Sequence, residues 1–293
     1  MLAGHGGMAR MNVYWLEQTE ADVPLEDRWL SAREMLSLSG LRFAKRRADW
    51  RLGRWTAKRA LSDCLGLPCD LSALADTEIR TAPSGAPQVF FVGQTRPVTI
   101  SISHRAGTAL CTVALSRDNL GCDLEMIERR SDAFTADYFT INERAMVERT
   151  LVENQPLLVT LLWSAKESAL KALGTGLRLD TNCLEVNFIE TLLPHSEQDR
   201  QDLDFVPTLT IDSDRWRPLH LRYCNTQVFG GWWRYTDTMV RTVVSAFSFC
   251  SPIHSVSLYR ENYSLLPEGA NTTRELLAPT RAITQSLPGL SES

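Results

Sequence analysis

Two acidic residues alternate with apolar ones in the segment GCDLEM, residues 121–126. If this segment is a β-strand, Asp123 and Glu125 lie on one face and their apolar neighbours face the core. The two carboxylates would then be about 7 Å apart, and they would repel each other unless a cation lay between them. Carboxylate, water and phosphate oxygens suit Mg2+, although the pattern alone equally fits an amphipathic edge strand with solvated acids. Gly121 moves the balance toward a site, because a glycine permits the close approach of another backbone or of a ligand.

A third acid lies in the segment LLWSAKESALKALGTG, residues 161–176. On a helix, Glu167 and Lys171 share one face, because they are four positions apart. Taken alone, such a pair is most simply a solvated ion pair, worth a few tenths of a kcal/mol. Lys166 falls within the apolar arc, where its stem can pass Trp163 to reach solvent, so a structural role is expected for it.

Basic residues are dense in the segment 41–54, where six of fourteen positions are Lys or Arg and aromatic residues are interleaved. This mixture indicates either a nucleic-acid surface or a phosphate pocket. The net charge of -4 and the lack of a second such segment favour a discrete phosphate pocket. Ser103 and His104 offer a hydroxyl and an imidazole at the end of an expected strand. A lone histidine there is usually structural, and the sequence has neither a P-loop nor a GxSxG elbow.

The composition is that of an ordinary globular protein, with 23% charged and 44% hydrophobic residues in 293. No apolar run approaches the roughly 20 residues that a membrane-spanning helix needs. The first ten residues lack the layout of a secretion signal. The seven scattered cysteines include no CxxC pair and favour reduced thiols in a cytosol. We therefore expect a cytoplasmic protein that binds neither membranes nor nucleic acids.

Hydrophobic periodicity and turn residues place the expected elements. Helices are expected over Leu25–Leu38 and Arg42–Leu67, after the capping box of Thr140 and Glu143, and over the segment that Gly174 and Gly176 close. The expected strands are Asn12–Leu16, Val98–Ser103, Ala109–Leu115, Leu120–Met126, Leu184–Ile189, Thr208–Ile211, Leu219–Tyr223, Gln227–Tyr235 and Val240–Phe249. Residues 251–293 lose this periodicity and are expected to be a flexible tail.

The sequence also repeats itself. Trp55-Thr-Ala-Lys58 returns as Trp163-Ser-Ala-Lys166, 108 positions later, and the helix-ending Leu65-Gly66 returns at the same offset. This register favours duplication. We therefore predict an α/β (α+β) fold, built as a pseudo-dimer of two related α/β halves, residues 1–118 and 119–250, with the active site in the cleft between them.

Five motifs, in this order, resemble Sfp-type 4'-phosphopantetheinyl transferases. They are LGRWTAKRAL (52–61), TAPSGAP (81–87), SISH (101–104) with GCDLE (121–125), Phe139-Thr-x-x-Glu143 and WSAKESALKALGTG (163–176). The resemblance covers roughly residues 12 to 250. It implies the phosphopantetheinyl transferase fold, which at this size is a pseudo-dimer with the cofactor in its cleft.

The resemblance also implies an activity. Such enzymes move the 4'-phosphopantetheine arm of coenzyme A onto a serine of an apo acyl- or peptidyl-carrier protein and release adenosine 3',5'-bisphosphate. The expected cofactors are Mg2+ and coenzyme A, the latter as substrate, and the expected partner is a carrier protein of fatty-acid, polyketide or nonribosomal-peptide synthesis. A monomer is expected.

Carried over onto this sequence, the resemblance assigns roles to individual residues. Asp123, Glu125 and Glu167 would hold Mg2+ against the pyrophosphate, Glu167 would also act as the base for the carrier serine, and Lys171 would meet the pyrophosphate. Ser103 and His104 would contact coenzyme A phosphates, with His104 acting as a cation if they protonate it. The candidates for the 3'-phosphate are Lys45, Arg46, Arg47, Arg54 and Arg80. The chain departs from the family at Gly85-Ala86-Pro87, where many members have a lysine, so Arg80 or a backbone group would substitute.

Two other functions compete with the transferase. One is a non-catalytic module that binds coenzyme A or a carrier protein in the same cleft, against which the presence of all three acids argues. The other, less favoured, is a small nucleic-acid-binding protein that uses residues 42–58.

Overall fold

The structure is a computed structural model that describes residues 12–188, 215–224, 227–246 and 252–254. Its mixed helices and sheets confirm the predicted α/β (α+β) class. Within those residues, no helix is both long and apolar enough to cross a membrane. The predicted strand Thr208–Ile211 lies outside the described residues.

The first part of the chain builds a four-stranded and a three-stranded sheet around one long helix. The four-stranded sheet has the order β12-β1-β6-β5, and the three-stranded sheet has the order β2-β3-β4. The elements are β1 (Val13–Thr19), η1 (Glu20–Asp22), α1 (Ala32–Ser39), α2 (Ala44–Leu65), α3 (Leu71–Asp76), β2 (Thr77–Thr81), β3 (Pro87–Phe91), β4 (Gln94–Thr95), β5 (Thr99–Arg105), β6 (Thr108–Ala114) and, from the far end of the chain, β12 (Ile253–His254).

The second part builds a five-stranded sheet with the order β7-β11-β10-β9-β8. Each neighbouring pair in it is antiparallel. The elements are β7 (Leu120–Met126), α4 (Asp132–Tyr138), α5 (Ile141–Arg149), α6 (Gln155–Leu173), η2 (Gly176–Arg178), η3 (Thr181–Cys183), β8 (Leu184–Phe188), β9 (Arg217–Tyr223), β10 (Gln227–Tyr235) and β11 (Met239–Ser245).

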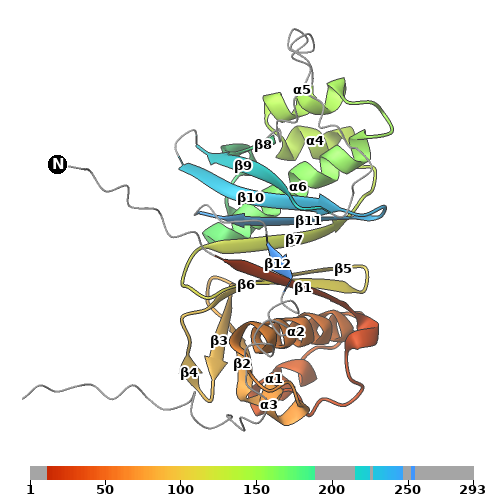
Figure 1. Ribbon diagram of the computed structural model, residues 1–293. Coiled ribbons are helices and arrows are strands. Elements are labelled where there is room, and N and C mark those ends of the chain that lie inside the picture. Colours follow the sequence, from red (N-terminus) through yellow and green to blue (C-terminus); the bar gives the residue numbers. More distant parts are fainter. Residues whose placement is uncertain (1–11, 189–214, 225–226, 247–251, 255–293) are drawn as a thin grey trace, which may run out of the picture.

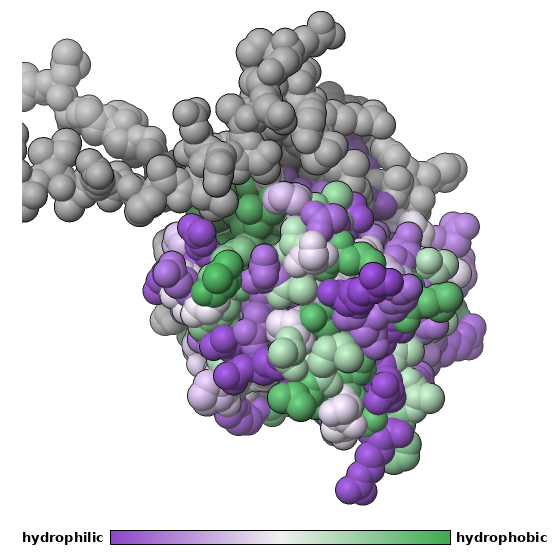
Figure 2. Space-filling model, turned by 90° about the horizontal axis from the view of Figure 1, so that it is seen from below, coloured by the Kyte–Doolittle hydropathy of each residue, from purple (hydrophilic) through white to green (hydrophobic). Residues whose placement is uncertain are grey.

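The two larger sheets pack face to face, with α2 and α6 on the outer sides (Figure 1). Alternation along β1 shows how one strand serves two cores. Val13 and Trp15 join Leu124 and Val243 between the sheets, whereas the intervening Tyr14 packs in the core under α2. A third core joins α6 to the other face of the five-stranded sheet. Seen from the end that carries α1 and α3, hydrophilic and hydrophobic residues are interspersed over the surface (Figure 2).

Each long helix buries a lysine in a cage of the same design. On α2, the Nζ of Lys58 lies 2.6 Å from the Oε2 of Glu34 and donates to the carbonyls of Trp29 and Leu74. Glu34 also closes the capping box of α1, and it accepts from the backbone N–H of Ile79 in β2 of the three-stranded sheet. The cage therefore fixes a helix terminus, a long helix and a strand with one ion pair.

The cage on α6 repeats these contacts. The Nζ of Lys166 lies 2.6 Å from the Oε2 of Glu143 and donates to the carbonyls of Tyr138 and Thr181. Glu143 closes the capping box predicted at Thr140, and it accepts from the N–H of Val186. The structural role expected for Lys166 is confirmed, but its expected route to solvent past Trp163 is wrong, because its side chain is fully buried against the carboxylate. The pseudo-dimer remains a prediction, which the two matching cages support.

Several predicted elements need correction. The first helix begins at Ala32, because Ser31 caps it, so Leu25–Leu30 lie outside it. Ile253–His254 were predicted to belong to a flexible tail from residue 251, and this is wrong for these two residues. They pair in parallel with β1, whose outer edge offers unpaired backbone groups. The rest of the predicted tail lies outside the described residues.

Candidate active site

The site lies where β7 meets α6 and β5. Gly121 makes the approach of β7 to α6 possible, because a Cβ there would lie 1.8 Å from the carbonyl oxygen of Ser168. The glycine therefore admits a backbone, one of the two options that the sequence left open. Thr242 of β11 holds the same stretch of α6, since its hydroxyl lies 2.7 Å from that of Ser168 and 2.9 Å from that of Ser164.

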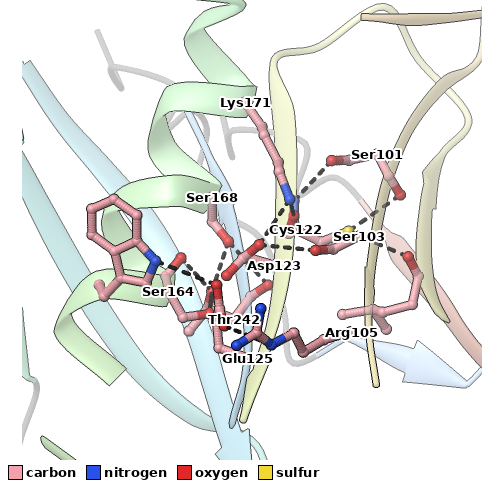
Figure 3. A network of polar contacts seen from close by, with 12 residues as sticks. Ser101, Ser103, Arg105, Cys122, Asp123, Glu125, Ser164, Ser168, Lys171 and Thr242 are labelled. Atoms are coloured by element: carbon pink, nitrogen blue, oxygen red, sulfur yellow. Dashed lines mark hydrogen bonds and ion pairs between the residues drawn. The ribbon is translucent and has the colours of Figure 1, made fainter. Parts of the chain in front are cut away.

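β5 approaches β7 through side chains, and both are edge strands of their sheets. The hydroxyl of Ser101 accepts from the N–H of Cys122 at 2.9 Å, and the hydroxyl of Ser103 donates to the Oδ1 of Asp123 at 2.9 Å (Figure 3). The site thus joins the edges of the two larger sheets.

Asp123 is buried and forms the centre of this network. Its Oδ1 also accepts from the Nζ of Lys171 at 2.8 Å, and the same ammonium donates to the carbonyl of Cys122 at 2.9 Å. Asp123 raises the pKa of Lys171 despite its burial, so this lysine stays charged. The Oδ2 of Asp123 is buried and has no hydrogen-bond partner, which leaves one carboxylate oxygen for a further cation or donor.

Glu125 has one hydrogen-bond donor and two arginines around its carboxylate. Its Oε1 accepts from the indole N–H of Trp163 at 3.3 Å, and its Oε2 lies 3.6 Å from Arg105 and 3.5 Å from Arg130. Burial first, and then the charge of Asp123, raise the pKa of Glu125 against the opposing effect of the two arginines. Removing one of the two arginine charges would therefore make Glu125 harder to ionise.

Burial and the charges of Asp123 and Glu125 also affect the pKa of Glu167. Burial is the largest cause that raises its pKa, and the charges of Asp123 and Glu125 raise it further, whereas Lys171 lowers it. The predicted sharing of a helix face by Glu167 and Lys171 is compatible with this, but the ion pair of Lys171 is made with Asp123. Lys171 therefore pairs with Asp123 of β7, and the simple solvated pair with Glu167 is not observed among the described residues.

Asp123, Glu125 and Glu167 are the residues predicted to hold Mg2+. No group of three His, Cys, Asp or Glu side chains in the described part of the chain stands ready to hold a metal ion. The donor chemistry nevertheless fits Mg2+, because carboxylate oxygens are its usual ligands and the Oδ2 of Asp123 and the Oε2 of Glu125 are buried without a hydrogen-bond partner. A bound divalent cation would offset the repulsion that raises the pKa of Glu125 and Glu167.

The two predicted phosphate contacts of β5 point to opposite sides of that strand. Ser103 lies on the side of Asp123, whereas the ring of His104 lies over Gly53 of α2, 4.0 Å from the position of a Cβ there. Burial lowers the pKa of His104, and the opposing charge of Asp49 only partly offsets it. The imidazole is therefore neutral near pH 7 in the protein alone.

The candidate basic residues have partners of their own. Lys45 pairs with Asp49, Arg47 donates to the carbonyl of Leu38, Arg54 lies 4.0 Å from Glu34 and over the ring of Trp50, and Arg80 pairs with Glu78 and lies over Phe90. Arg46 is exposed. No contact among the described residues joins these five side chains to Asp123, Glu125 or Glu167, so their assignment to the 3'-phosphate stays a prediction.

The sequence reasoning missed Arg105, Arg130 and the role of Trp163. The two arginines also share Glu128, at 3.1 Å and 3.0 Å, and so form a four-residue network with Glu125. Arg105 is two residues after Ser103, so strand alternation could have placed it on the same face of β5 as Ser103. Nothing in the sequence pattern could have paired Trp163 with Glu125, because that contact depends on how α6 crosses β7.

Part of the chain is similar to a known protein family and to solved structures. Residues 119–224 match the model of the ACPS family, the 4'-phosphopantetheinyl transferase superfamily. Among solved structures, the chain is similar to a holo-(acyl-carrier-protein) synthase from Bacillus anthracis in complex with CoA (3',5'-ADP), with 23% identity over 36% of this chain and 96% of that one and a TM-score of 0.31. It is also similar to the Helicobacter pylori holo-[acyl-carrier-protein] synthase in complex with coenzyme A, with 22% identity over 34% of this chain and 96% of that one and a TM-score of 0.28. The matched region contains β7, α6 and all three acids of the site, so this part of the chain is similar to the 4'-phosphopantetheinyl transferase superfamily.

Proposed function

We propose that this protein transfers the 4'-phosphopantetheine arm of coenzyme A to a serine of an apo acyl- or peptidyl-carrier protein and releases adenosine 3',5'-bisphosphate. The observation that carries the proposal is the position of Asp123, whose carboxylate joins Lys171 of α6 and Ser103 of β5. Asp123 and Lys171 lie within the region that the superfamily model matches, whereas Ser103 precedes it, and the contacts hold an acid and a cation beside one another. The Sfp-type subtype, a monomeric state and a cytoplasmic location belong to the same proposal.

Phosphoryl transfer mainly requires that negative charge be positioned and offset. Asp123, Glu125 and Glu167 would hold Mg2+, which when bound supplies the positive charge that the diphosphate needs. Lys171 supplies a second, permanent charge from the same side, and its contact with the Cys122 carbonyl fixes where that charge lies. The ammonium group would therefore exchange part of its contact with Asp123 for a phosphate oxygen.

Glu167 is the group that we propose as the base. It lies on the same side of α6 as Lys171, one turn earlier, and its pKa is raised by burial and by the neighbouring acids. Its carboxylate would take the proton of the carrier serine, directly or through a water molecule, and beside a metal and Lys171 its position should matter more than its basicity. Lys171 opposes this rise in the pKa of Glu167.

Coenzyme A would lie along the side of the site that β5 and α2 form. Ser103 can turn its hydroxyl from Asp123 to a phosphate oxygen without moving the backbone. A phosphate beside His104 would raise the pKa of this imidazole and convert it to a cation, against the lowering that burial causes in the free protein. Lys45, Arg46, Arg47, Arg54 and Arg80 remain the proposed set for the 3'-phosphate.

The test is a direct assay. The protein is incubated with coenzyme A, Mg2+ and a panel of apo carrier proteins from fatty-acid, polyketide and nonribosomal-peptide systems, and each carrier is weighed by mass spectrometry. We expect the addition of one phosphopantetheine to at least one carrier, and loss of that addition when EDTA removes the metal. Binding of coenzyme A without any transfer across the panel would instead support a non-catalytic module. Salt-dependent binding of oligonucleotides, with which coenzyme A does not compete, would support a nucleic-acid-binding protein.

A further inference from the structure

Two cysteines face each other at the edge of the five-stranded sheet that is farthest from β7. Leu184 and Tyr223 are register partners at the ends of β8 and β9, so Cys183 and Cys224 are the next pair outward. The N–H of Cys224 donates to the carbonyl of Cys183 at 2.8 Å, which joins the two residues just beyond the strands, where Cys183 ends η3 and Cys224 has a left-handed backbone with a φ of 45°. Both cysteines are free thiols in the structure.

This pairing meets the geometric requirement for a disulfide. With standard backbone bond lengths, the hydrogen bond of 2.8 Å from the N–H of Cys224 to the carbonyl of Cys183 keeps their Cα atoms within about 6.7 Å of each other. Disulfides form when that separation is about 4.4–6.8 Å. The backbone therefore already holds the two residues at a distance that a disulfide can bridge, and no rearrangement of the sheet is required.

The electrostatics agree that the side chains are neighbours. Burial is the largest cause that raises the pKa of Cys183, and the thiol of Cys224 raises it further. Cys224 is also the main cause that raises the pKa of Tyr223. Cys224 is exposed and Cys183 is partly exposed, so a small reagent can reach the pair from solvent.

We propose that Cys183 and Cys224 are a redox modification site that closes to an intramolecular disulfide when the protein meets a low-molecular-weight disulfide such as oxidised glutathione. The thiolate of exposed Cys224 attacks one sulfur of oxidised glutathione, breaks its S–S bond and releases one glutathione thiolate. The thiolate of Cys183 then attacks the Sγ of Cys224 and releases the second. Two protein thiols are oxidised, one glutathione disulfide is reduced to two thiols, and the two protons pass to the released thiolates.

The bond would act on stability rather than on the proposed transfer. It would close a covalent loop that contains β8 and β9, and such a loop restricts the unfolded chain. Asp123 and Glu125 lie on β7, at the other end of the strand order, so these two acids are separated from the bond by the rest of the sheet. The proposal therefore does not depend on the proposed function, and the two can fail separately.

The experiment uses the full chain with Cys69→Ser and Cys250→Ser, because Cys69 is an exposed thiol and Cys250 lies outside the described residues. The remaining three cysteines, Cys64, Cys111 and Cys122, are buried, and burial raises the pKa of each. This protein is treated with oxidised glutathione at about pH 8.5, where ordinary thiols are half ionised, and is then weighed intact. The matched control carries the additional change Cys183→Ser.

We expect the parent protein to lose two hydrogen atoms and to carry no glutathione, whereas the Cys183→Ser control should carry one glutathione on Cys224. Digestion without reductant should give one peptide pair joined through Cys183 and Cys224, and the melting temperature should rise and return on reduction. A parent protein that keeps glutathione on Cys224, or that stays unmodified while the control reacts, would overturn the proposal. Failure of both proteins to react would overturn it as well, because Cys224 would then not be accessible to the reagent.

Discussion

Helices α2 and α6 hold their buried lysines in matching cages but present different side chains immediately after them. At the shared offset of 108 positions, Lys58 corresponds to Lys166, whereas Arg59 corresponds to Glu167 and Asp63 to Lys171. Both helices also end in a glycine with a left-handed backbone, Gly66 and Gly174. The buried lysine and the terminal glycine are thus repeated, whereas the two charged residues that follow the lysine have opposite signs in the two helices.

The two tryptophans of the repeat show the same contrast. Trp163 donates its indole N–H to Glu125, whereas the indole nitrogen of Trp55 is buried without a hydrogen-bond partner. The tryptophan of α6 therefore orients an acid, whereas that of α2 packs against Trp29. The comparison teaches that the cage is a structural element and that the site depends on the residues around it.

The largest effect should come from breaking either cage. Lys166→Met leaves Glu143 buried without its partner, and Lys58→Met does the same to Glu34, so each should lower the free energy of unfolding by about 3–5 kcal/mol in urea titrations. Equal losses would support equivalent cages. The double variant Glu143→Gln/Lys166→Met should recover part of the loss, because no uncompensated charge remains, and a double variant no more stable than Lys166→Met would contradict this explanation.

The next largest effect is expected on the transfer rate, and it should differ between corresponding positions of α6 and α2. Glu167→Gln should lower the transfer rate by about 100-fold or more with the fold retained, because the proposed base is lost. The matched change at the corresponding position, Arg59→Gln, should leave the rate within a few-fold of the parent protein. Rates are measured by carrier mass, and circular dichroism checks the fold. Full activity of Glu167→Gln would remove the assignment of the base.

A smaller effect should distinguish the two tryptophans. Trp163→Phe keeps an aromatic ring beside Phe134 and Tyr138 but removes the donor to Glu125. We expect the Mg2+ concentration for half-maximal transfer to rise by about tenfold, as for the loss of one hydrogen bond to a charged group. Trp55→Phe removes a donor that has no partner and should leave this concentration unchanged. Equal shifts in both variants would mean that packing, and not the hydrogen bond, is responsible.

The smallest effect is a pH dependence on the α2 side of β5. Because burial lowers the pKa of His104, the unfolded chain binds its proton more tightly, and the free energy of unfolding should fall as the pH drops below the ordinary histidine value of about 6.5. His104→Gln should make the decline between pH 7 and 5 shallower. Asp49→Asn should make it steeper, because the charge of Asp49 opposes the lowering. Chemical denaturation across this pH range measures all three proteins, and identical slopes would contradict the prediction.

Much of the fold was predictable from local pattern. The bounds of β7 and β10 match their predicted ranges, and the capping box at Thr140 opens α5 as predicted. These signals depend on neighbours in the chain, so a sequence contains them directly. The cage partners were not predictable, because Glu34 and Lys58 are far apart in sequence and meet only when α1 packs on α2.

The candidate site divides in the same way. Residue types and spacing alone determined that Asp123 and Glu125 share a strand face, that Glu167 and Lys171 share a helix face, and that Gly121 admits a close neighbour. Only the tertiary structure decided that the neighbour is α6, that Lys171 pairs with Asp123 and not with Glu167, and that Arg105, Arg130 and Trp163 surround Glu125. The reason is physical: periodicity fixes the direction of a side chain relative to its own element, whereas its partner depends on how separate elements pack.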